Sequence, residues 1–198
     1  MANVVIIGHS FVKRLDRALE GSWTNLGFHD DPTNIVVSCV GKSGGRLPDV
    51  YAREVTDRLR EQIADLVLLQ IGGNDLDCSR IEDAKDSIVN NLLSIVEWLA
   101  SGLSVVRIGI LQLFYRRSTR HVSVHKYNEA VDYVNSALKA KCKTLNFCFF
   151  WRHKGLKDGV FPHLSHDGVH LNTTGMRRYI LSVRGAALYG LRNASGRV

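Results

Sequence analysis

The sequence predicts an α/β protein in which helices cover both faces of a parallel β-sheet, a three-layer α/β/α sandwich. Five short apolar runs alternate along the chain with five longer helix-like stretches, and in residues 81–100 and 124–143 the apolar residues recur at helical spacing. Most positions in the short runs are apolar, which is typical of strands buried on both faces. Right-handed crossovers between such strands place helices on both sides of the sheet. No linker, repeat or low-complexity segment interrupts the pattern, so we expect a single domain over residues 1–198.

Each predicted element has its own signal. The strand-like runs are residues 4–7, 35–40, 66–71, 105–111 and 145–150. The helix-like stretches are residues 11–20, 48–62, 81–100, 124–143 and about 173–191. Pro48 suits a first helical turn, where its missing N–H has no partner to lose, and Gly102 is expected to end the third helix. Thr173 or Thr174 is expected to cap the last helix.

Composition and charge narrow the classes of function. The net charge of +7 is uneven, because residues 1–115 carry 11 Lys and Arg against 15 Asp and Glu, whereas residues 116–198 carry 15 against 4. A basic C-terminal half is expected either to contact RNA or anionic lipid weakly, or to form an ordinary solvated surface. No apolar run is long enough to cross a membrane. The N-terminus has no basic region followed by an apolar run, so we expect no signal peptide and a cytoplasmic protein.

The cysteines and histidines give no metal signature. Cys39, Cys78, Cys142 and Cys148 are widely spaced, and no Cys-x-x-Cys pair occurs. We therefore expect free, buried thiols of a reducing compartment, and neither a metal nor a cofactor.

The residues that follow the strands carry the functional information, because ligands of open parallel sheets bind at the carboxyl ends of the strands. After the first strand comes Gly8-His9-Ser10, which places Ser10 at a helix start, where free N–H groups favour developing negative charge. A serine at this position is also a common helix cap. Val12 stands where the nucleophile elbow Gly-x-Ser-x-Gly of α/β-hydrolases needs glycine, which argues against that fold.

Two glycine-rich segments follow the second and third strands. In residues 41–45 three glycines let the backbone approach a ligand closely, and Gly44 could donate its N–H to an oxyanion. The segment is not a P-loop, because it lacks Gly-Lys-Ser/Thr at its end. After the third strand, Gly72-Gly73 precedes Asn74, whose side chain could be a second donor or simply form a turn.

Near the C-terminus, Asp167 precedes His170 by three residues. On a turn, such a carboxylate reaches the imidazole Nδ1 and leaves Nε2 free to take a proton from a serine. Alone, the pair is as compatible with an ordinary polar loop as with a catalytic pair. Together, however, the strand-end motifs supply a nucleophile, a base, an orienting group and oxyanion donors, which are the parts that acyl transfer needs.

In this set of motifs the sequence resembles the SGNH, or GDSL-like, hydrolase superfamily. The resemblance covers nearly the whole chain, from Gly8-His9-Ser10 through Gly44 and Gly72-Gly73-Asn74-Asp75 to Asp167-Gly168-Val169-His170. It implies a flavodoxin-like fold with a five-stranded parallel sheet in the order 2-1-3-4-5. It also implies Ser10 as nucleophile, His170 as base and Asp167 as its orienting partner. The oxyanion hole would consist of the N–H groups of Ser10 and Gly44 and the Asn74 side chain.

One position departs from the family pattern, in which the motif after the first strand usually reads Gly-Asp-Ser. His9 replaces the aspartate, and we expect it to be a surface histidine without a role. A narrower resemblance, over the segment from Phe150 to Leu188, is to the esterase domains of LINE retrotransposon open-reading-frame-one proteins. The run Phe114-Tyr115-Arg116-Arg117 follows the fourth strand, so it either rims the site, binds an acidic partner or is an ordinary loop.

The leading expectation is therefore a serine ester hydrolase that acts on a small ester or lipid-like substrate through an acyl-enzyme. Short acyl groups such as acetyl follow from the family resemblance. The alternative is a hydrolase fold kept for binding RNA or anionic lipid through its basic half. No sequence feature specifies the oligomeric state.

Overall fold

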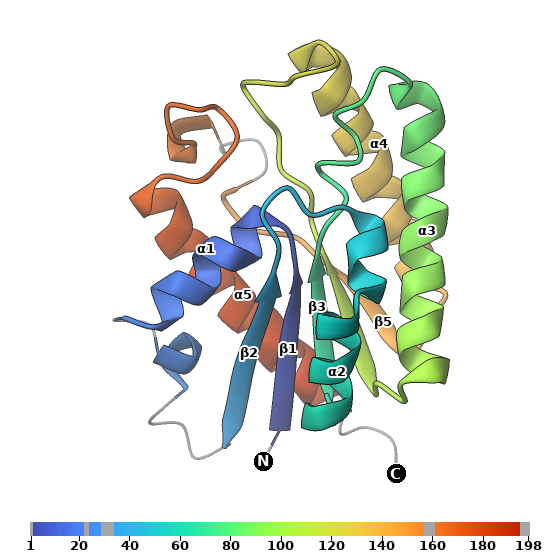
Figure 1. Cartoon of the computed structure of the whole chain (residues 1–198), viewed down its shortest axis with the longest axis vertical. Helices are drawn as coiled ribbons and strands as arrows, with labels where there is room; N and C mark the ends of the chain where they lie inside the picture. The colour runs from blue at the N-terminus through green and yellow to red at the C-terminus, as the bar shows by residue number, and fades with distance from the viewer. Residues whose placement is uncertain (1, 22–23, 29–33, 157–160, 195–198) are drawn as a thin grey trace.

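The structure, a computed structural model, describes residues 2–21, 24–28, 34–156 and 161–194, and it has the predicted α/β/α architecture (Figure 1). Five parallel strands form one sheet in the order β2-β1-β3-β4-β5. The strands are β1 (Ala2–Gly8), β2 (Ile35–Gly41), β3 (Leu66–Gln70), β4 (Arg107–Leu111) and β5 (Cys148–Trp151). The fold class and the strand order expected from the sequence are confirmed.

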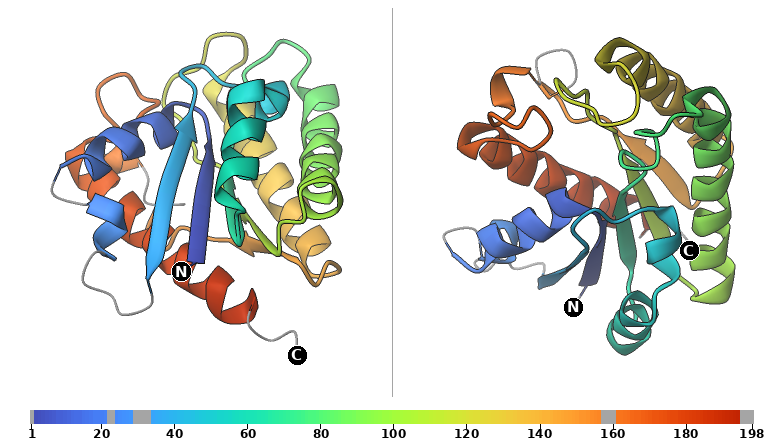
Figure 2. Two further views of the ribbon diagram at one scale, coloured as in Figure 1. Left: turned by 60° about the horizontal axis from the view of Figure 1, so that its bottom comes forward. Right: turned by 45° about the horizontal axis from the view of Figure 1, so that its top comes forward.

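Helices cover both faces of this sheet (Figures 1 and 2). The α-helices are α1 (Ser10–Leu19), α2 (Arg53–Gln62), α3 (Ile81–Gly102), α4 (Val124–Cys142) and α5 (Thr173–Ala194). Short 3-10 helices occur at Thr24–Gly27, Leu47–Tyr51 and Phe161–His163. α1 and α5 pack on one face, and α2, α3 and α4 pack on the other.

The period of two along each strand divides the core into two layers. In β1, Val5 and Ile7 pack with α2, α3 and α4, whereas Val4 and Ile6 pack with α1 and α5. All four side chains are buried, which explains why the strand is apolar at successive positions instead of alternating.

The register brings the carboxyl ends of the first three strands together. Gly8 of β1 pairs with Gly41 of β2 on one side and with Gln70 of β3 on the other. The segments that follow these strands therefore leave the sheet at one edge, which the right-hand view of Figure 2 turns toward the reader. The residues singled out after the strands belong to this edge.

Several predicted boundaries are corrected. The expected helix over residues 48–62 is two elements, because Ala52 adopts an extended conformation (φ −60°, ψ 146°) between the 3-10 helix and α2. The fifth strand begins at Cys148 and not at residue 145, since Leu145 donates its N–H to Cys142 O in a turn after α4. The fourth strand begins at Arg107 and not at residue 105, because Val105 is hydrogen-bonded back to Leu99 of α3.

The cap of the last helix is also corrected. Asn172, one residue before the expected Thr173 or Thr174, accepts the N–H of Gly175 at 2.9 Å and so caps α5. α3 includes Gly102 as its last residue. The four cysteines are free, as predicted, but only Cys142 and Cys148 are buried. Among the described helices, none combines the length and the apolar character that a membrane span requires.

Candidate active site

The turn between β1 and α1 places Ser10 at the first position of a helix. β1 ends at Gly8 and α1 begins at Ser10, so the N–H groups of the first helical turn point toward the edge of the sheet. His9 caps this helix, because its Nδ1 accepts the N–H of Phe11 at 3.4 Å. Among the described residues, no acceptor takes the N–H of Ser10. A free donor therefore lies beside the Ser10 hydroxyl.

His9 is not the surface histidine that the sequence suggested. The residue is only 2% exposed, and Gly45 of the loop after β2 and Gly73 of the loop after β3 lie against it. Burial, reinforced by the nearby charges of Arg116 and His170, lowers the pKa of His9 to about 3. The ring is therefore neutral at pH 7, and because Nδ1 accepts a hydrogen bond, the ring proton is on Nε2. A neutral imidazole caps the helix at the position where the family usually has a carboxylate.

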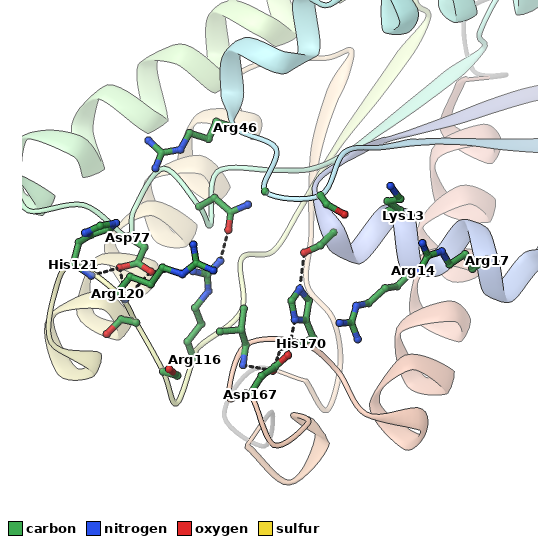
Figure 3. Close-up of a pocket in the computed structure, with 17 residues that line it drawn as sticks. Lys13, Arg14, Arg17, Arg46, Asp77, Arg116, Arg120, His121, Asp167 and His170 are labelled. Carbon is green, nitrogen blue, oxygen red and sulfur yellow. Dashed lines mark hydrogen bonds and ion pairs between the residues drawn. The ribbon is translucent and has the colours of Figure 1, made fainter.

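The structure brings Ser10, His170 and Asp167 into one hydrogen-bonded chain (Figure 3). Ser10 Oγ lies 2.8 Å from His170 Nε2, although the two residues are 160 positions apart in sequence. Asp167 Oδ2 lies 2.7 Å from His170 Nδ1, which is the contact expected from the three-residue spacing. Because the carboxylate accepts the Nδ1 proton, Nε2 is left to accept the hydroxyl proton of Ser10.

The turn around Asp167 holds its carboxylate in the ionised form. Asp167 Oδ1 accepts the N–H groups of Val169 and His170 at 2.9 Å each and the Ser165 hydroxyl at 2.8 Å. Partial burial opposes ionisation, but these bonds and the bond to the His170 ring together hold the pKa of Asp167 well below its usual range. Gly168 has φ +70°, a left-handed conformation that glycine adopts without a Cβ clash. The carboxylate is thus fixed before any substrate binds.

The expected oxyanion donors surround Ser10. Gly44 has φ +69° in the turn after β2, and no described residue accepts its N–H. The Asn74 amide donates one hydrogen from Nδ2 to Gly45 O at 2.9 Å, which leaves its second hydrogen free. Both residues line the same pocket as Ser10 and His170. The three donors that the family resemblance names therefore lie around one space.

Arg116 is a site residue whose role the sequence analysis did not identify. Its Nη2 donates to Asn74 Oδ1 at 2.8 Å, which fixes which end of the amide carries the free N–H group. The guanidinium is buried, lies 4.9 Å above the Tyr127 ring and approaches Asp77 at 3.6 Å. The sequence contains one indication of this role, because Arg116 stands just after β4, at the edge of the sheet where the other motifs meet. Of the three interpretations of residues 114–117, a place at the rim of the site therefore applies to Arg116. Phe114 is instead a core residue.

A pocket of about 500 Å³ opens over Ser10, a volume that suits a small molecule. The residues that line it come from α1, from the loops after β2, β3 and β4, and from the turn at Asp167 (Figure 3). Val169 is the only aliphatic side chain among the described lining residues, and most of the others are charged or hydroxylic. Among the described residues, no group of three His, Cys, Asp or Glu side chains is arranged to hold a metal ion.

Comparisons with known proteins identify the family and the fold of this chain. The sequence matches the model of the GDSL-like lipase/acylhydrolase family over residues 7–178. A search of curated proteins found no match. Similar solved structures include a GDSL-like lipase from Bacteroides thetaiotaomicron (TM-score 0.67, 17% identity, 93% of this chain and 86% of that one). Another is a carbohydrate esterase family 3 protein from Talaromyces cellulolyticus (TM-score 0.70, 13% identity, 96% and 97%).

An acetyl esterase variant crystallised with acetate is a further similar structure, with a TM-score of 0.67, 13% identity and coverage of 96% of this chain and 97% of that one. At these identities the structures share a fold with this chain. The match to the family model spans residues 7–178, which is most of the sequence. This protein belongs to the GDSL-like lipase/acylhydrolase family.

Proposed function

We propose that this protein is a serine ester hydrolase that works through an acyl-enzyme. The hydrogen-bonded chain from Ser10 through His170 to Asp167 carries the proposal, with distances of 2.8 and 2.7 Å. A nucleophile, a base and an orienting carboxylate in this order are what acyl transfer from an ester requires. The unpaired N–H groups of Ser10 and Gly44 add a place for negative charge.

The reaction follows from these positions. His170 Nε2 takes the hydroxyl proton of Ser10 as Oγ attacks the ester carbonyl carbon. The resulting oxyanion accepts hydrogen bonds from the N–H groups of Ser10 and Gly44 and from Asn74 Nδ2. The bond from carbon to the alcohol oxygen then breaks, and His170 returns its proton to that oxygen. In the second half, water attacks the acyl carbon, His170 takes the water proton, and Ser10 Oγ leaves with a proton as the acid is released.

The pocket favours a short acyl group. A long acyl chain needs an apolar wall, and Val169 alone offers an aliphatic side chain among the described lining residues. The similar structures include an acetyl esterase and an acetyl xylan esterase. Acetyl esters are therefore the proposed substrates.

Hydrolysis of 4-nitrophenyl acetate tests the proposal. Ser10→Ala should lower kcat by about 10⁴-fold or more, because acylation then has no nucleophile. Ser118→Ala is the matched control, since Ser118 lines the same pocket but is not among the hydrogen-bond partners of His170 or Asp167 in the described residues. An alanine variant at position 10 that hydrolyses the ester at the wild-type rate would refute the assignment.

Binding of RNA or anionic lipid by the basic half is the second candidate, favoured by the net charge of residues 116–198. Binding should weaken steeply between roughly 50 and 200 mM salt, because counterion release drives it. It should persist in Ser10→Ala. The absence of binding at low salt would contradict it. The narrower resemblance to LINE open-reading-frame-one esterase domains stays a prediction.

A further inference from the structure

The site is lined by an excess of cations that the hydrolysis of a neutral ester does not need. Six of the residues that line the pocket are Lys13, Arg14, Arg17, Arg46, Arg116 and Arg120. Building on the proposed esterase function, we infer that the substrate is an anionic ester whose alcohol part carries a phosphate group. Arg14 and Arg17 would bind that group.

Three of the cations come from the same helix as the nucleophile. Lys13, Arg14 and Arg17 follow Ser10 by three, four and seven positions, so they share its face of α1. Figure 3 shows them on the side of the pocket that α1 forms. Among the described residues, no carboxylate is ion-paired with any of the three. Within the described part of the chain, no direct ion pair therefore competes with a ligand for these three charges.

The two acidic residues of the described pocket lining, Asp77 and Asp167, already have hydrogen-bond partners. Asp167 bonds to His170 and to its own turn. Asp77 accepts the backbone N–H groups of Arg120 and His121 at 3.0 to 3.1 Å and lies 3.6 Å from the Arg116 guanidinium. Neither carboxylate neutralises the cations of α1. The described lining of the pocket is positively charged on balance, and the N-terminal end of α1 adds the positive end of a helix dipole.

The position of His170 indicates which part of the substrate carries the anion. His170 must donate its proton to the alcohol oxygen, so the alcohol lies on the His170 side of Ser10. Figure 3 shows the Arg14 side chain extending from α1 toward that side. A phosphate a few bonds beyond the ester oxygen would thus meet Arg14, with Arg17 one turn further along the helix. Arginine suits this task, because its planar fork forms paired, charge-assisted hydrogen bonds to phosphate oxygens.

A matched pair of substrates tests the inference. Wild-type protein should hydrolyse 1-acetylglycerol 3-phosphate with a kcat/KM at least tenfold above that for 1-acetylglycerol in low salt. The ratio should fall by about tenfold in Arg14→Gln and in Arg17→Gln, as expected for the loss of one charge-assisted contact. Arg60→Gln, which removes an exposed arginine of α2 outside the pocket, should leave the ratio unchanged. Added salt should lower the ratio by screening.

The outcomes separate this inference from the proposed function. If the two esters are hydrolysed equally well, or if the arginine variants keep the wild-type ratio, recognition of an anionic substrate is refuted and the esterase function stands. If neither ester is hydrolysed and 4-nitrophenyl acetate is also inert, the esterase function itself fails. A third arm presents 1-oleoyl-2-acetylglycerol 3-phosphate in neutral vesicles and measures the release of acetate, so that the acyl group that is cleaved stays acetyl. Arginine-dependent hydrolysis there would assign the phosphate to a lipid headgroup, and hydrolysis of the soluble ester alone would assign it to a small phosphorylated alcohol.

Discussion

Two buried histidines should make the fold lose stability in mild acid. His9 and His153 are 2% and 0% exposed, and burial is the main cause that lowers the pKa of each to about 3. In the unfolded chain both return to about 6.5, so below that pH the unfolded state binds protons that the folded state does not. A group whose folded pKa is lowered in this way favours unfolding as the pH falls. The fold therefore loses stability as the pH falls from 6.5 to about 3.

The magnitude follows from the proton difference. Each histidine changes the free energy of unfolding by about 1.4 kcal/mol per pH unit, so the pair removes about 4 kcal/mol between pH 6.5 and 5. Asp75 acts in the opposite direction, because burial raises its pKa to about 6 and the folded state takes up its proton first. This offsets at most about 1.4 kcal/mol between pH 6 and 5, and less because the carboxyl is partly exposed. The net loss from pH 7 to 5 is about 3 kcal/mol, a large share of a domain's stability.

The variant that isolates His9 is His9→Asn. Asparagine can still accept the Phe11 N–H as a helix cap but does not titrate. Urea unfolding at pH 7, 6 and 5 should show a loss smaller by about 2 kcal/mol than in the wild type, the contribution of one histidine over 1.5 pH units. His125→Asn is the control, because the His125 side chain on α4 is 83% exposed. Equal pH slopes in the wild type and His9→Asn would show that His9 is not held neutral by burial.

Two further predictions concern residues around the site. Arg116→Gln should lower kcat for 4-nitrophenyl acetate by about ten- to a hundredfold with a smaller change in KM, because the amide of Asn74 loses the partner that orients it. Steady-state kinetics on a variant that thermal melting shows to be folded would test this prediction. An unchanged kcat would contradict it. Asp75→Asn should stabilise the fold by about 1 to 2 kcal/mol at pH 7, where Asp75 is charged although its burial disfavours the charge. At pH 4 the carboxyl is already protonated, so the same substitution should change the stability by little. Denaturant unfolding at the two pH values would decide it, and an equal effect at both would count against the raised pKa.

The fold could be predicted from the sequence because its signals are local and repeated. Strands buried on both faces are apolar at successive positions, and β1 and β3 are buried throughout most of their length. The errors occurred at the ends of elements, where the backbone conformation differs from the one that the apolar pattern predicts. Leu145 is apolar and next to a strand, yet its N–H is used in the turn after α4. The composition of residues 48–62 does not predict the extended conformation of Ala52.

In the candidate site too, residues in local motifs could be predicted, whereas contacts between distant segments could not. Ser10, Asn74 and His170 could be found because each stands in a short motif directly after a strand or in a turn. The burial of His9 could not, since it depends on loops from other strands that close over it. The contact between Arg116 and Asn74 joins residues 42 positions apart, and neither neighbourhood contains a pattern that specifies it. Such contacts follow from the sheet order, which the motifs alone do not determine.

The distribution of charge shows why sequence position is a poor guide to electrostatics at the site. Along the chain, residues 1–115 are net negative and residues 116–198 are strongly positive. In space, the pocket draws Lys13, Arg14, Arg17 and Arg46 from the acidic half and Arg116 and Arg120 from the basic half. The carboxylates that balance the first half lie mostly outside the pocket, so they cannot neutralise it at short range. The positive charge of the pocket is therefore a product of the fold, which adds four cations of the acidic half to two of the basic half, and not of the basic half of the chain alone.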